Sequence, residues 1–112
     1  MLDAMKLQRP TDFLILNHLM EEGRNVAVNL ALEIDKSRSH VNVRLPVLED
    51  YDLVEKIGPA ENSGLYQITG KGQVTAAYED EYGKEGVDFD ALVERKLDEC
   101  NGDLDATAVI AE

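Results

Sequence analysis

Apolar residues recur at helical spacing in three stretches of the first half of the chain. The first predicts a helix from Thr11 to about Glu22, with Thr11 as its cap and Gly23 as its end. Its apolar stripe is Ile15, Leu16, Leu19 and Met20. The second predicts a short helix from Asn29 to about Ile34, with Leu30 and Ile34 inward. Residues 24–28 before it fit either a brief strand or an extended lead-in.

The third stretch predicts a longer helix that begins after Ser37 and runs to Asp50. Ser37 is the expected N-cap, and the inward positions are Val41, Leu45 and Leu48. Pro46 removes one backbone hydrogen bond and should bend or end regular helix locally, but we still expect the helix to reach Asp50. A short helix, a tight turn and a second helix make the helix-turn-helix pattern.

Alternating residues then predict a β-hairpin with strands over 53–57 and 65–69, joined by the polar loop 58–64. Thr69 should cap a fourth helix that runs through Tyr82, and a fifth helix should run from Phe89 to about Glu99. The packing positions of the fourth helix are Val74, Ala77 and Tyr78, and those of the fifth are Phe89, Leu92, Val93 and Leu97.

This order predicts a mainly α fold with a small β-hairpin (α+β), a winged helix-turn-helix with an extra C-terminal helix. We expect residues 1–83 to form the DNA-binding domain, and residues 84–112 to form an acidic helix and tail that can serve as a dimerisation element. The stripe of the fifth helix, together with Met1, Leu2 and Met5, either meets a partner helix or packs on its own domain.

The net charge at first argues against binding of nucleic acid, because 11 basic and 23 acidic residues give a value of −12. Its distribution changes this interpretation. Residues 1–48 carry six basic and six acidic side chains, whereas the remainder carries five and seventeen. The acidic bias resembles that of proteins from salt-loving archaea, and at about 1 M salt the Debye length is only roughly 3 Å. Acidity therefore does not exclude DNA binding.

Residues 36–48 contain three basic residues and no acid, and they coincide with the third helix. The predicted DNA-reading residues are Lys36, Ser37, Arg38, Ser39, His40, Asn42 and Arg44. Arginine and asparagine suit base edges, and serine near a helix N-terminus suits phosphates. The plain alternative is an ordinary solvated helix face. In the hairpin, Lys56, Asn62 and Ser63 can touch the DNA backbone or the minor groove, or form an ordinary loop.

The run SRSHVNVRLPVLEDYDLVEKIGPAENSGLYQITGKG resembles the core of the haloarchaeal phage phi-H repressor group of winged helix-turn-helix transcriptional regulators. The similarity spans roughly residues 10–78. It implies a DNA-binding regulator with contacts at Arg38, Ser39, Asn42 and Arg44. Asp52 stands where such sequences usually have glycine, and aspartate tolerates the left-handed conformation that this turn requires.

No nucleophile motif, metal-spaced cluster or phosphate loop is recognisable, so we expect neither an enzyme nor a metal or cofactor site. No apolar run approaches membrane-spanning length and the first residues lack a signal-peptide core, so a cytoplasmic protein without a membrane partner is expected. Cys100 is the single cysteine and cannot form an internal disulfide. No small-molecule ligand is identifiable.

The expected function is a sequence-specific, repressor-like transcriptional regulator that binds double-stranded DNA as a homodimer. The third helix, residues 37–50, should read the major groove, and the wing, residues 58–64, should contact the backbone or minor groove. The rival hypothesis is a winged-helix module that binds another protein through its acidic surface and does not bind DNA.

Overall fold

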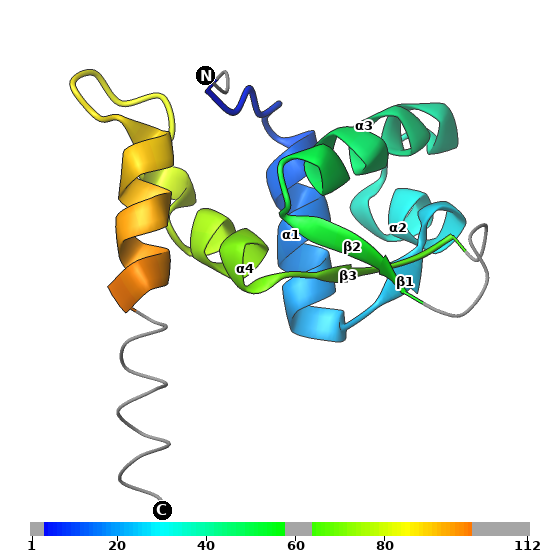
Figure 1. Cartoon of the computed structure of the whole chain (residues 1–112). Helices are drawn as coiled ribbons and strands as arrows, with labels where there is room; N and C mark the ends of the chain where they lie inside the picture. Colours follow the sequence, from blue (N-terminus) through cyan, green and yellow to red (C-terminus); the bar gives the residue numbers. More distant parts are fainter. Residues whose placement is uncertain (1–3, 58–63, 100–112) are drawn as a thin grey trace, which may run out of the picture.

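The computed structural model describes residues 4–57 and 64–99 (Figure 1). In chain order the elements are α1 (Thr11–Glu22), β1 (Asn25–Val26), α2 (Ala27–Ile34), α3 (Arg38–Asp50), β2 (Val54–Ile57), β3 (Leu65–Ile68), α4 (Gly70–Ala77) and the 3-10 helix η1 (Glu79–Glu81). A C-terminal helix follows over residues 89–99. The predicted α+β architecture, with its hairpin and extra helix, is confirmed.

The strands form one antiparallel sheet in the order β1-β3-β2. β3 pairs with β2 from Val54↔Ile68 to Ile57↔Leu65, and its other edge pairs with β1 through Asn25↔Tyr66. The segment before α2 is therefore a two-residue strand, and α2 begins at Ala27, two residues earlier than predicted. β1 ties the start of the helix-turn-helix to the hairpin.

Helix α1 is the central element of the core, with α2 and α3 on one side and α4 on the other (Figure 1). Phe13, Ile15, Leu16 and Leu19 are each at most 1% exposed. Met20, which was predicted to belong to this stripe, is 41% exposed. The predicted cap is also wrong, because Pro10 occupies the N-cap position and Thr11 is a buried residue of the helix.

The fourth helix is shorter than predicted. α4 begins as expected, with the Thr69 side chain accepting a hydrogen bond from the Gly72 amide at 3.0 Å, but it ends at Ala77. Ala77 is exposed, and the buried positions include Val74 and Ala76. The chain then turns through η1, and the Tyr82 ring packs against Phe13 and Phe89 with centroid distances of 5.7 and 5.1 Å. This aromatic packing explains why the helix does not continue.

The apolar stripe of the C-terminal helix packs on its own chain. Phe89 and Val93 are buried in the same core as Met5, and Leu92 and Leu97 pack partly buried against that core. Met1 and Leu2 lie outside the described residues. Packing on its own domain, one of the two predicted uses of this stripe, is therefore observed, and contact with a partner helix stays a prediction.

Gly72 allows α4 to approach the turn between α3 and β2. A Cβ at this position would overlap the Leu53 carbonyl oxygen and lie 2.6 Å from Ile68 Cγ1. We expect Gly72→Ala to lower the free energy of unfolding by about 1–3 kcal/mol, because overpacking outweighs the better helix propensity of alanine. The matched control is Gly70→Ala, where the nearest atom, Leu97 Cδ1, lies 3.8 Å away. Urea unfolding that gave both variants equal stability would contradict this prediction.

Candidate nucleic-acid interface

A tight turn joins α2 to α3 and sets the direction of α3. Asp35 adopts the left-handed conformation (φ 58°) at the end of α2, and the Lys36 amide donates to the Ala31 carbonyl at 3.0 Å. Ser37 then caps α3, as predicted, its Oγ accepting from the His40 amide at 3.1 Å. At the far end, Asp52 is left-handed (φ 67°), as expected for the position where glycine is usual. α3 therefore has well-defined hydrogen-bonded ends.

Helix α3 anchors one face in the core and presents the other to solvent. Val41, Leu45 and Leu48 are 0–1% exposed, as predicted, and the helix continues through Pro46 to Asp50. The exposed residues in its first three turns are Arg38, Ser39, Asn42, Val43 and Pro46. We call this surface the α3 face. It combines a cation, a hydroxyl, an amide and two apolar side chains.

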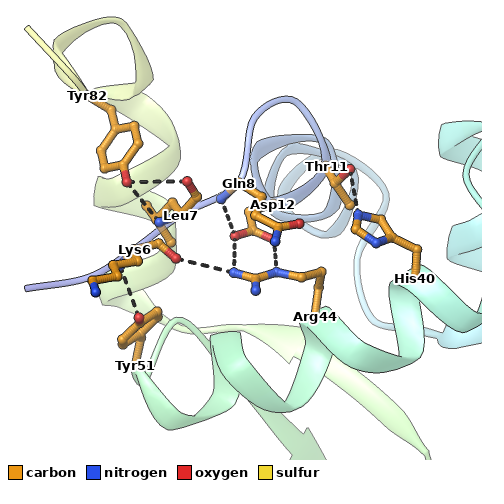
Figure 2. Close-up of polar contacts among 9 residues, drawn as sticks. All are labelled: Lys6, Leu7, Gln8, Thr11, Asp12, His40, Arg44, Tyr51 and Tyr82. Atoms are coloured by element: carbon orange, nitrogen blue, oxygen red, sulfur yellow. Dashed lines mark hydrogen bonds and ion pairs between the residues drawn. The ribbon is translucent and has the colours of Figure 1, made fainter.

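The predicted exposure of Arg44 is wrong, because this residue is only 8% exposed and points toward α1 (Figure 2). Its Nε donates to Asp12 Oδ1 at 2.9 Å, and its Nη2 donates to Asp12 Oδ2 at 2.7 Å. Asp12 itself is 0% exposed. The two hydrogen bonds make a bidentate, buried ion pair between α1 and α3. Arg44 therefore positions α3 and does not belong to the α3 face.

The N-terminal segment completes this buried pair. The Gln8 amide donates to Asp12 Oδ2 at 2.7 Å, and Arg44 Nη2 also donates to the Lys6 carbonyl at 3.3 Å (Figure 2). The hydrogen bond to Asp12 raises the pKa of Arg44 above its already high ordinary value, against the opposing effect of burial. Because a raised pKa keeps the guanidinium charged up to still higher pH, its stabilising contribution persists throughout the neutral and moderately alkaline range.

His40 is the second predicted reading residue that faces inward. It is half-buried, and its Nε2 lies 3.2 Å from Thr11 Oγ1 (Figure 2). The ring thus connects α3 to the start of α1. Together with Arg44, His40 fixes the orientation of α3 on α1, and neither side chain lies on the α3 face.

The remaining predicted residues divide by position. Lys36 is half-buried in the turn before α3, and Ser37 is exposed but uses its hydroxyl as the cap. Lys56 is exposed on β2, with its ammonium 5.9 Å from the centroid of the Tyr66 ring. Asn62 and Ser63 lie outside the described residues.

The N-terminal end of α3 is electrostatically suited to anions. No acidic residue occupies its first turn, and the helix dipole adds partial positive charge there. Among the described residues the basic side chains in ion pairs are Arg44, Lys71, Lys84 and Lys96, so Arg38 has no carboxylate partner. The acidic residues of α3 are Glu49 and Asp50, at its opposite end. The charge of this helix therefore runs from basic to acidic along its axis.

Two features of this region were missed in the sequence. The first is that the N-terminal segment is hydrogen-bonded to two distant parts of the fold. The Lys6 amide donates to the Tyr51 hydroxyl at 3.0 Å, and the Leu7 amide donates to the Tyr82 hydroxyl at 2.8 Å. The other feature is Val43, which is 62% exposed on the α3 face. In the sequence, Val43 could have been recognised as an apolar residue that lies outside the stripe formed by Val41, Leu45 and Leu48.

The described residues hold no group of three or more histidine, cysteine, aspartate or glutamate side chains arranged to bind a metal ion. None of the helices in the described ranges is both long and apolar enough to span a membrane.

Comparison with known proteins agrees with this geometry. Residues 8–55, which run from the N-terminal segment into β2, match a family described as winged helix-turn-helix DNA-binding. The fold is a winged helix-turn-helix. In this winged helix-turn-helix, α3 is the second helix of the motif, and β2 and β3 form the wing.

Solved structures share the fold at low sequence identity. A MarR family regulator from Neisseria meningitidis is 21% identical, with a TM-score of 0.58 over 93% of this chain and 76% of that one. A MarR family protein from Bacillus stearothermophilus is 19% identical, with a TM-score of 0.56 over 88% and 76%. No curated protein sequence matches the chain significantly. These similarities establish the winged helix-turn-helix architecture.

Proposed function

We propose that this protein is a sequence-specific DNA-binding transcriptional regulator that reads the major groove with α3. The observation that carries the proposal is the α3 face, where Arg38, Ser39 and Asn42 are exposed and no acid occupies the first turn. Arginine pairs with guanine and asparagine with adenine through two hydrogen bonds each. The exposed N-terminal end of a helix suits a backbone phosphate.

The comparisons support the same class of function. The family matched by residues 8–55 is described as DNA-binding, and one of the solved structures is described as a regulator. We extend regulation of transcription to this chain as part of the proposal. The finer assignment, to a haloarchaeal group of phage phi-H repressor-like regulators, is supported by the sequence around α3 and the wing and by the acidic composition.

The contact residues follow from the positions of the side chains. We assign base contacts to Arg38 and Asn42, phosphate contacts to Ser39 and the turn that contains Lys36 and Ser37, and a backbone contact to Lys56 of the wing. Asn62 and Ser63 remain predicted wing contacts on the strength of the sequence alone. Arg44 and His40 are assigned a positioning role, because their polar atoms are engaged with α1.

We further propose that the regulator acts as a homodimer. A single short helix reads only a few base pairs, and two copies related by a twofold axis would place their α3 helices in major grooves about 34 Å apart. Of the apolar stripe predicted to form the dimer contact, Phe89 and Val93 are buried within the chain, whereas Leu92 and Leu97 are only partly buried. Residues 84–112 stay in the proposal as a dimerisation element.

Selection from a genomic fragment library in concentrated potassium salt tests the proposed function. High salt is appropriate because it screens the repulsion between phosphates and the acidic surface of a chain with net charge −12. We expect the full chain to enrich fragments that share a short motif, repeated in inverted orientation with half-sites about 10 base pairs apart. A motif without the repeat would contradict the homodimer, and the absence of any enriched motif would contradict DNA recognition.

The rival function is a protein-binding winged helix. It is favoured by the net charge of −12, which would repel nucleic acid at low salt and attract a basic partner. The same selection separates the two functions, because a protein-binding module would enrich no DNA motif at any salt concentration.

A further inference from the structure

Val43 is an apolar side chain exposed at the centre of the surface that faces DNA in the proposed function. It is 62% exposed, whereas the other valines and the leucines of α3 are buried or, for Val47, half-buried, and Pro46 is the other exposed apolar residue of the α3 face. Ser39, a proposed phosphate contact, lies one helical turn before Val43 on the same side of the helix, and Asn42, a proposed base contact, precedes it in the chain. An apolar residue at this position contributes nothing to the core of the described chain.

The major groove offers few apolar groups to such a side chain. Guanine, adenine and cytosine present hydrogen-bond donors and acceptors, and thymine alone among the four bases adds a C5 methyl group. Valine is branched at Cβ and restricted in χ1, so it can present a methyl group in a fixed direction at a low entropy cost. Asparagine, the adjacent residue, suits adenine, which is the partner of thymine in a base pair.

We propose that Val43 is a specificity-determining residue that packs against the C5 methyl group of a thymine in the operator. This inference rests on the proposed function and makes it more specific: α3 reads at least one A·T pair through an apolar contact as well as through hydrogen bonds. Replacement of Val43 by alanine should leave the fold intact, because the side chain is largely exposed.

Deoxyuridine tests the contact directly, since it lacks the C5 methyl group and keeps the hydrogen-bonding pattern of thymine. In the operator obtained by selection, each thymine is replaced in turn by deoxyuridine, and the dissociation constant is measured for the unmodified protein and for Val43→Ala. We expect one position per half-site where deoxyuridine weakens binding about 3–5-fold, which is the contribution of one buried methyl group. At that position, deoxyuridine should have no effect on Val43→Ala.

A matched control and separately defined outcomes distinguish the Val43 contact from DNA recognition in general. Val87→Ala makes the same change at a 37% exposed valine before the C-terminal helix and should bind like the unmodified protein. Circular dichroism and thermal unfolding check that Val43→Ala is folded. The Val43 assignment is overturned if each deoxyuridine weakens the binding of both proteins equally, or if the operator lacks thymine. DNA recognition stands in either case. If the unmodified protein selects no motif, the proposed function itself fails, and the assignment fails with it.

Discussion

Asp12→Ala should lower the free energy of unfolding by about 3–5 kcal/mol, which is a typical cost of removing one partner of a buried ion pair. Asp12 is 0% exposed and accepts hydrogen bonds from both Arg44 and the Gln8 amide. Without its carboxylate, the Arg44 guanidinium stays buried, with the Lys6 carbonyl as its remaining acceptor at 3.3 Å. Urea unfolding followed by circular dichroism measures the loss.

Three comparisons distinguish the loss of a buried ion pair from a general electrostatic effect on stability. Asp80→Ala changes the net charge equally at an exposed position and should shift the free energy of unfolding by no more than about 0.5 kcal/mol. The Asp12→Ala loss should persist in concentrated potassium salt, because buried pairs are screened far less than exposed ones. The double variant Asp12→Ala with Arg44→Met should recover part of the loss, since no unpaired charge remains buried. Equal stability of Asp12→Ala and Asp80→Ala would contradict the prediction.

Hydrophobic periodicity predicted the elements well where local sequence determines them. Ser37 and Thr69 cap the helices that they were expected to cap, because a side-chain oxygen at a helix start has a nearby amide to satisfy. The left-handed turn at Asp52 was likewise predictable from local chemistry. These features depend only on residues within a few positions of one another.

The errors that affect the candidate site arose where contacts distant in sequence decide the outcome. Tyr82 was expected to lie in α4, but its packing against Phe13 and Phe89 ends the helix early. Arg44 was placed on the exposed face from its type, although it follows Val41 by three residues and precedes Leu48 by four, and so borders the buried stripe. Its partner Asp12 is 32 residues away, and no local pattern identifies that pairing.

The burial of Arg44 changes which residues can be used to test DNA recognition. Arg38 and Arg44 are the two arginines of α3, and acid substitution at both is a direct way to separate a DNA-binding regulator from a protein-binding module. At Arg44 an acid would face the buried Asp12 carboxylate, and any loss of binding would then report unfolding. Arg38 is exposed, lies in the first turn of α3 and has no carboxylate partner among the ion pairs of the described residues.

Arg38→Glu should therefore weaken binding to the selected operator about 100-fold or more and leave the unfolding curve unchanged. Loss of an arginine contact to a base costs about 1–3 kcal/mol, and the new carboxylate adds repulsion from the phosphates. Arg95→Glu is the matched control, because it makes the same charge change on the C-terminal helix, at the opposite end of the molecule from the start of α3 (Figure 1). Fluorescence anisotropy with labelled operator measures both. If the two variants lost affinity equally, net charge would explain the effect, and the assignment of Arg38 as a reading residue would be wrong.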